Sequence, residues 1–189
     1  FDTGRYIEGL HREKRVPLKI RREFERGDLI NPARTLKVLR EQIKKIAGAD
    51  FGIALSGSPR TVFEAFGDSQ TIGVMAALTQ AYGKQSINVF ELDIPQETTV
   101  LRNSKRRVCS VCWKPHLLGP SLGNCPFCGG KLIKRVQDKP EIIKNRLKEY
   151  KERTMPVLAK MRKAGFEVVK IDGRPKPTFV FNSIKRHLK

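Results

Sequence analysis

Long hydrophobic segments and acidic residues are both scarce in this sequence. Its 189 residues include 19 Asp and Glu against 38 Lys and Arg. The uncharged run Ser69–Gly83 is too short and too polar to span a bilayer. The first residues carry Asp2 and Arg5 where a signal peptide needs an apolar core. These absences argue against a membrane or secreted protein, and we expect a cytoplasmic location.

The net charge of +19 is distributed unevenly along the chain. Residues 101–140 carry nine basic side chains and one acidic side chain, whereas residues 51–100 carry two basic and five acidic ones. Positive charge concentrated in one region suits a phosphate-rich ligand, either a nucleotide or a nucleic acid. A lysine-rich, solvated surface gives the same composition. Charge alone therefore does not choose between a specific anion site and a soluble surface.

Cysteine is absent except for two C-x-x-C pairs separated by twelve residues, Cys109 with Cys112 and Cys125 with Cys128. Each pair offers two thiolates from one tight turn, and four sulfur ligands form a closed tetrahedral zinc site of the structural type. His116 lies between the pairs but is not needed as a ligand. Disulfide bonds are the alternative, although they are uncommon in cytosolic proteins.

Helix and strand signals alternate along most of the chain. Helices are predicted over 31–48, 61–81, 95–104 and 140–164, with a bend at Pro156 and a further helix of about ten residues after Asp172-Gly173. Strands are predicted over 51–55, 87–93 and 166–171. This alternation predicts a parallel α/β sheet with right-handed crossovers, into which the cysteine region is inserted.

Several short motifs follow one another in a fixed order. They are Asp2-Thr3-Gly4, 27–30 (GDLI), 56–61 (SGSPRT), Arg102-x-x-x-Arg106, Arg135-x-x-Asp138, Arg146-Leu147-x-x-Tyr150 with Thr154-x-Pro156, and Asp172-Gly173. In this order the chain resembles, over essentially its whole length, the adenylate kinases of the bacterial type with a zinc-bearing lid. The resemblance implies a P-loop kinase-like sheet of roughly five parallel strands with helices on both faces. It divides the chain into a core domain (1–105 and 137–189), an AMP-binding helical region (about 3–47) and a zinc-binding lid (106–136).

The same resemblance assigns roles on the nucleotide side of the site. Thr3 and the backbone of Ile30 would contact the base and ribose of AMP, and Arg60 would hold its phosphate. Glu64 would lie at the adenine edge. Gly173 would lie against the bound nucleotide.

Four further arginines would surround the ATP phosphates. Arg102 and Arg106 would clamp them from the lid side, and Arg135 and Arg146 would meet the transferring group. Phosphoryl transfer is catalysed largely by positioning and charge neutralisation, for which the permanently charged, forked guanidinium is well suited. The implied activity is ATP + AMP = 2 ADP, by a monomeric transferase of nucleotide biosynthesis that uses Mg2+ with ATP and structural Zn2+.

Three positions depart from the family pattern. Glu8 stands where the family has an arginine for the AMP phosphate, and Arg5 or Arg12, one turn away on either side, could substitute. Ser56 replaces an aspartate that helps hold magnesium. Glu64 replaces a glutamine that reads adenine. A carboxylate only accepts hydrogen bonds, so guanine-like donors could also satisfy it.

The glycine-rich loop G-x-x-x-x-G-K-[ST] that opens this family is absent from the 189 residues. In the family, the strand before that loop lies in the middle of the sheet, so here the strands 51–55 and 87–93 would flank a gap. We expect that the sequence lacks an amino-terminal part or that another element fills the gap, and that the 189 residues alone have poor activity. The alternative function is that of a catalytically impaired, kinase-like zinc protein that binds RNA or an anionic assembly.

Overall fold

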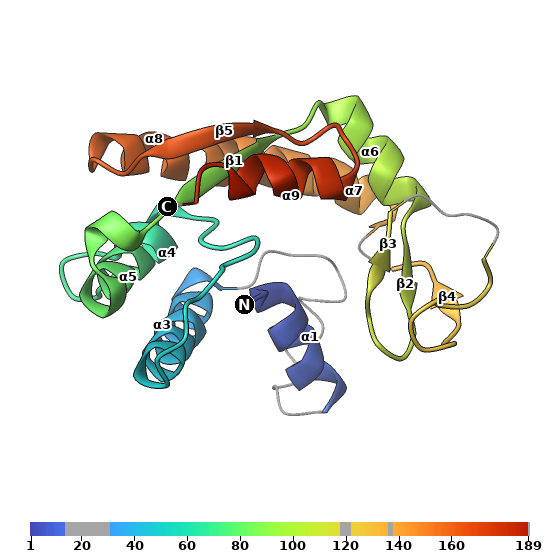
Figure 1. Cartoon of the computed structure of the whole chain (residues 1–189), viewed down its shortest axis with the longest axis horizontal. Coiled ribbons are helices and arrows are strands. Elements are labelled where there is room, and N and C mark those ends of the chain that lie inside the picture. The colour runs from blue at the N-terminus through green and yellow to red at the C-terminus, as the bar shows by residue number, and fades with distance from the viewer. Residues whose placement is uncertain (14–30, 118–121, 136–137, 189) are drawn as a thin grey trace.

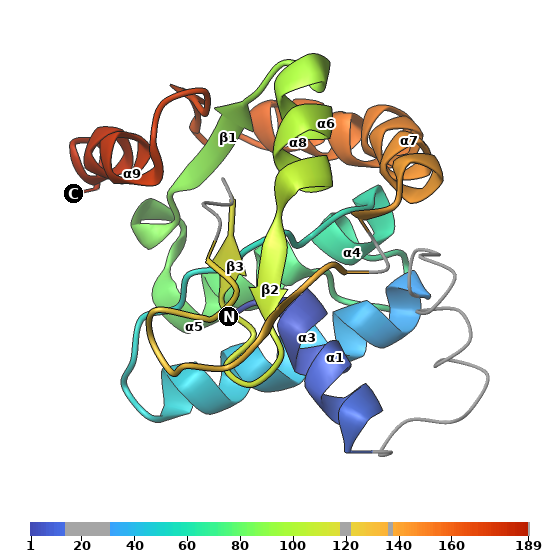
Figure 2. The same cartoon turned by 90° about the vertical axis from the view of Figure 1, so that its right-hand side faces the viewer.

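The fold is seen in a computed structural model that describes residues 1–13, 31–117, 122–135 and 138–188. Its main parallel pair consists of β1 (Val89–Asp93) and β5 (Val168–Asp172), with Val89 opposite Val168 and Asp93 opposite Asp172. Helices α8 (Met155–Lys163) and α9 (Pro177–Lys185) both contact β5. β1 runs between α9 on one side and α6 and α8 on the other (Figure 2). The predicted α/β class, with a parallel sheet flanked by helices, is confirmed.

The remaining helices surround this pair (Figure 1). They are α1 (Thr3–Arg12), α3 (Pro32–Gly48), α4 (Val62–Phe66), α5 (Val74–Tyr82), α6 (Gln96–Lys105) and α7 (Pro140–Glu149), with a 3-10 turn, η1, at Lys84–Ser86. The start of α3 follows from local chemistry, because the Asn31 side-chain oxygen accepts the Ala33 N–H at 2.9 Å and Pro32 takes the first turn. None of the described helices is long and apolar enough to cross a bilayer.

The helix predicted over 61–81 is wrong, because the structure divides it into α4 and α5. Gly67 ends α4 with φ of +71°, and a side chain there would collide with the Thr71 carbonyl oxygen. Gly73 then opens α5, at a point where an added Cβ would collide with the backbone of Phe66. Two glycines in a close turn therefore interrupt an otherwise helical sequence.

The strand predicted over 51–55 is also wrong. The chain there forms a single parallel bridge, between Asp2 and Ser56, and the Ser56 N–H donates to the Phe1 carbonyl at 3.0 Å. Among the described residues β1 pairs with β5 alone, so the main sheet has two strands rather than about five. Phe51 remains 69% exposed. A strand forms where a neighbouring strand satisfies its backbone hydrogen bonds, and among the described residues this segment has only the bridge at Ser56.

Two apolar clusters hold the helices on the sheet. Leu36, Leu39 and Ile43 of α3 pack with Val74 of α5, and partly buried Leu55 joins them. A second cluster lies under the strands. It contains Ala65, Met75, Val157 and Met161, with Val89 and Val168 packed against it.

Leu39 is 0% exposed, so its truncation tests the first cluster directly. Leu39→Ala is expected to lower the free energy of unfolding by about 2–5 kcal/mol, because it removes buried methyl groups and leaves a cavity. Leu101→Ala is the control, since Leu101 is 49% exposed. The measurement is urea unfolding of both variants. Equal losses in the two would contradict this assignment of the core.

The cysteine region forms its own three-stranded antiparallel sheet in the order β3–β2–β4. Its strands are β2 (Arg107–Cys109), β3 (Pro115–His116) and β4 (Leu132–Ile133). In Figure 1 this sheet lies at the end of the molecule opposite α5. The predicted interruption of the α/β pattern by the cysteine region is therefore observed.

The helix predicted over 140–164 is present, and a π-helical turn divides it. After α7 the turn η3 (Tyr150–Thr154) leads into α8. The Met155 N–H donates to the Tyr150 carbonyl, five residues back. Pro156 in the first turn of α8 has no N–H to donate, so the regular helical ladder is interrupted near the turn. Such turns are frequent at functional sites.

Candidate functional site

Arg146 of α7 lies among the charges of three other arginines. Desolvation, together with the charges of Arg60, Arg106 and Arg135, lowers the pKa of Arg146 to about 10, while Asp138 opposes the shift. Arg146 is nevertheless partly open to solvent. A pKa of about 10 leaves it charged at neutral pH. The four arginines outnumber Asp138, the one carboxylate whose charge opposes the shift, and such an excess of positive charge attracts a polyanion.

Arg106 is held in this group by Asp138. The Arg106 Nε donates to Oδ2 of Asp138 at 2.8 Å, and its Nη2 donates to Oδ1. The side chains are 15% and 4% exposed, respectively. A bidentate, nearly buried pair fixes the plane of the guanidinium. The pair links the residue after α6 to the residues before α7.

Replacing Asp138 tests this link. Asp138→Asn is expected to lower the free energy of unfolding by about 3 kcal/mol, because it leaves Arg106 with an uncompensated charge beside other arginines. Glu152→Gln is the matched control, since the Glu152–Lys148 pair is exposed and 3.9 Å long, and such pairs contribute about 0–1 kcal/mol. Chemical denaturation measures both. A loss for Asp138→Asn no larger than that of the control would contradict the role given to the pair.

Arg60 lies in the turn before α4, and its side chain is anchored to that turn. Its Nε donates to the Gly57 carbonyl at 2.6 Å. Glu64 is only 1% exposed, and its Oε2 accepts the Arg60 backbone N–H at 2.6 Å. Burial raises the pKa of Glu64, while that hydrogen bond and the charge of Arg60 oppose the rise. The contact of Glu64 with a nucleotide base remains a prediction.

Of the residues predicted to contact AMP, Thr3 is the first residue of α1. Thr3 is buried, and its Oγ1 accepts a hydrogen bond from the Ser58 hydroxyl at 2.9 Å. Thr3 therefore lies against the same 56–61 turn that carries Arg60. Ile30 lies outside the described residues.

Arg102 of α6 is placed differently from the other four arginines. Its guanidinium donates to the carbonyl of Gly173 at 2.6 Å, to that of Arg174, and to that of Pro175 at 3.3 Å. The arginine charges that act most strongly on Arg146 are those of Arg60, Arg106 and Arg135. The structure therefore groups Arg60, Arg106 and Arg135 with Arg146, and places Arg102 at the loop after β5.

Gly173 closes that loop onto the end of β1. Its N–H donates to the Asp93 carbonyl at 2.9 Å, and a side chain at this position would collide with Ile94. Asp93 and Asp172 are the last residues of β1 and β5. In open α/β sheets, ligands bind beyond the carboxyl ends of parallel strands. Arg102 and Gly173 lie at that edge.

Sequence reasoning gave Thr154 no role beyond its place in a motif. Its hydroxyl donates to the Arg60 carbonyl at 3.0 Å. No local sequence pattern points to this contact, because the two residues are far apart along the chain. The only indication in the sequence is that Thr154-x-Pro156 belongs to the ordered series of motifs.

The four cysteine sulfurs lie within 4.8 Å of one another, so they could hold a metal ion. None of the four cysteines forms a disulfide bond. The Cys109 and Cys128 sulfurs are 3.4 Å apart, and the Cys112 and Cys125 sulfurs are 3.6 Å apart. Zn–S bonds of about 2.3 Å in a tetrahedron require separations of about 3.8 Å. The donor set and its spacing therefore fit zinc.

The backbone around Cys109 favours its thiolate. Burial opposes ionisation, but N–H groups of Cys112 and Val111 donate to its sulfur and lower the pKa of Cys109 to about 6. Gly130 closes tightly over the same sulfur, because an added Cβ would lie 2.8 Å from it. A thiolate is the form in which cysteine binds a metal ion.

A parallel strand pair covered by helices, with an inserted four-cysteine sheet, is consistent with the P-loop kinase class of α/β folds. No protein-family model matches the chain. It is 32% identical over 171 residues to an adenylate kinase of Methanothrix thermoacetophila, covering 87% of this chain and 74% of that relative. It is 33% identical over 174 residues to one of Dehalococcoides mccartyi, covering 88% and 74%.

A third relative is an adenylate kinase of Thermosipho africanus, 31% identical over 150 residues. That match covers 77% of this chain and 66% of the relative, so the chain spans about two thirds of its length. The chain belongs to the adenylate kinase family, whose members are phosphotransferases.

Proposed function

We propose that this protein is a nucleoside monophosphate kinase that catalyses ATP + AMP = 2 ADP. The observation that carries the proposal is the cluster of Arg60, Arg106, Arg135 and Arg146, where desolvation and then the charges of the other three arginines lower the pKa of Arg146. Packing like charges together is unfavourable unless a ligand of opposite charge binds among them. Two nucleotides that meet through their phosphates supply such a ligand.

In the proposed reaction an oxygen of the AMP phosphate attacks the γ-phosphorus of ATP. The bond from that phosphorus to the β–γ bridging oxygen breaks, and the electron pair leaves with ADP. Arg60 binds the AMP phosphate, and Arg146 and Arg135 donate to the oxygens of the transferring group. Arg106 and Arg102 bind the phosphates of ATP. Mg2+ that arrives with ATP adds charge neutralisation, and the arginines fix the line of attack.

The zinc-binding segment 106–136 is proposed to act as a lid over these phosphates. Arg106 and Arg135 stand at its two ends, and both act on Arg146. Movement of the segment would therefore carry two of the phosphate-binding arginines with it and exclude water from the site. We also place the protein in the cytoplasm, since its four free cysteines suit a reducing compartment.

The test is a reaction of the full-length protein with Mg2+, ATP and one monophosphate at a time, with products separated by chromatography. The proposal predicts formation of ADP from AMP, and comparison with GMP measures the effect of Glu64 on base preference. Absence of a diphosphate product with every monophosphate, together with salt-sensitive binding to single-stranded RNA, would contradict it.

A further inference from the structure

We propose that Thr154 is a positioning residue that fixes the phosphate-binding Arg60 through its backbone carbonyl. This inference rests on the function proposed above. The Thr154 hydroxyl donates to the Arg60 carbonyl at 3.0 Å, across 94 positions of sequence. Thr154 touches no reacting group in this scheme and acts through Arg60 alone.

Arg60 is held by three separate hydrogen bonds. Its backbone N–H donates to Oε2 of Glu64, and its Nε donates to the Gly57 carbonyl, each at 2.6 Å. Both partners belong to the same short stretch of chain as Arg60. Thr154 supplies the only one of these three bonds that comes from another element, so it links the Arg60 backbone directly to the long helix.

The π turn explains how this hydroxyl becomes available. A threonine inside a regular helix usually bonds to a carbonyl one turn back, as Thr79 does with Met75 at 2.8 Å. Thr154 is the last residue of the π turn and directs its hydroxyl to Arg60 instead. Arg146 lies eight residues earlier on the same helical rod. One continuous helical segment therefore carries Arg146 and also holds Arg60, which couples the positions of two phosphate-binding groups.

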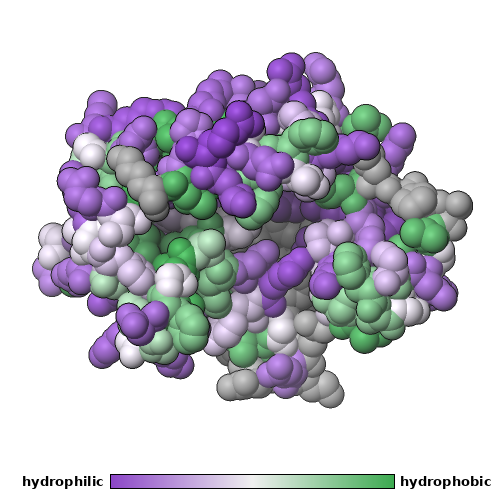
Figure 3. Space-filling model, viewed as in Figure 1, coloured by the Kyte–Doolittle hydropathy of each residue, from purple (hydrophilic) through white to green (hydrophobic). Residues whose placement is uncertain are grey.

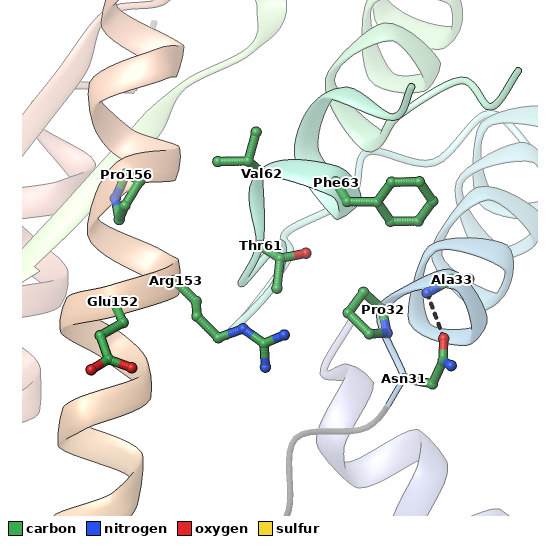
Figure 4. A pocket seen from close by; sticks show the side chains of 9 residues that line it. All are labelled: Asn31, Pro32, Ala33, Thr61, Val62, Phe63, Glu152, Arg153 and Pro156. Atoms are coloured by element: carbon green, nitrogen blue, oxygen red, sulfur yellow. Dashed lines mark hydrogen bonds between the residues drawn. The ribbon is translucent and has the colours of Figure 1, made fainter. Parts of the chain in front are cut away.

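The contact borders an open space rather than a packed core. The neighbours of the two bonded residues, Thr61 and Arg153, line a cavity of about 470 Å³ between α3, α4 and α8. Figure 4 shows the Arg153 side chain reaching across this cavity towards Thr61. Beyond the cavity the two segments pack through Ala65 of α4 and Val157 of α8. That apolar packing has no direction of its own, so the hydroxyl adds a directed bond that fixes the Arg60 carbonyl.

The test compares Thr154→Val, which removes the hydroxyl and keeps the shape, with Thr154→Ser, which keeps the hydroxyl. Thr154→Val is expected to raise KM for AMP about three- to tenfold, the effect typical of one lost hydrogen bond. We expect KM for ATP and the melting temperature to stay close to those of the parent. Thr154→Ser restores KM for AMP. Thr79→Val is the matched control, because its hydroxyl makes only a local helical bond.

A second readout does not depend on activity. In nuclear magnetic resonance spectra the Thr61 backbone amide shares its peptide group with the Arg60 carbonyl, so its chemical shift responds to the hydrogen bond from Thr154. That shift is expected to change in Thr154→Val and to return in Thr154→Ser. An unchanged shift, or an unchanged KM for AMP in an active enzyme, overturns the inference. A parent protein that neither binds AMP nor forms ADP overturns the proposed function, and the chemical-shift measurement still decides the role of Thr154.

Discussion

Arg146→Met is expected to slow ADP formation by a factor on the order of 100 to 1,000, the usual cost of removing one donor to a developing charge. The same change should not destabilise the protein. Arg146 lies close to three other arginines, and desolvation and their charges lower its pKa to about 10, so it is held in an unfavourable place. Removing its charge relieves that repulsion. Loss of activity without loss of stability is typical of residues kept for catalysis.

The measurement combines a steady-state assay with thermal unfolding. Arg162→Met is the control, because Arg162 is roughly half exposed and pairs with Glu91 at 2.7 Å away from the cluster. The control should keep its rate within about twofold, since exposed pairs contribute little. A fall in both rate and melting temperature for Arg146→Met would mean that the residue is structural, and a normal rate would remove it from the mechanism.

Removal of the metal is expected to unfold the cysteine region while the α/β part survives. Strands of two or three residues, such as β2, β3 and β4, are too short to be stable alone. The four sulfurs are the groups that bring the region together, so metal binding supplies its folding free energy. The purified protein should contain about one zinc per chain. Cys112→Ser should reproduce the effect of a chelator.

The measurement is metal analysis together with amide hydrogen exchange. After chelation, protection should be lost over 107–133 and retained in α3, α5 and α8. Ser110→Ala is the control, because Ser110 is an exposed neighbour of the cysteines. A metal-free preparation with unchanged protection over the cysteine region would contradict the assignment of a structural zinc site.

Elements with local causes could be predicted from the sequence. Asn31 and Pro32 mark the start of α3 because the cap is made by neighbouring residues. The strand predicted over 51–55 is wrong because its formation is not a local matter. Whether an apolar run becomes a strand depends on pairing with segments distant in sequence, and the described residues supply only the bridge between Asp2 and Ser56. The break between α4 and α5 had a local signal in Gly67 and Gly73, whose close packing could not be known before the fold.

The candidate site divides in the same way. The cysteine spacing alone predicts a metal site, because both pairs form their own turns. The arginines have no such local signature, and their grouping depends on how α4, α6 and α7 pack together. Only the order of motifs indicated the five arginines. Four of them, Arg60, Arg106, Arg135 and Arg146, act on one another in the structure, whereas Arg102 bonds to the 173–175 loop. Asp138 and Thr154 stood in the motifs without roles, because ion pairs and tertiary hydrogen bonds cannot be predicted from sequence position.

Hydrophilic residues predominate along the upper edge of the face in Figure 3, with hydrophobic residues scattered among them. We expect the phosphates of two nucleotides to meet at the cluster of Arg60, Arg106, Arg135 and Arg146. The most direct measurement starts from ADP alone, with Mg2+ and the full-length protein, and follows all three nucleotides by chromatography. ATP and AMP are expected to appear in equal amounts, and Arg146→Met should suppress both. ADP that remains unchanged, or ATP that appears without AMP, would contradict it.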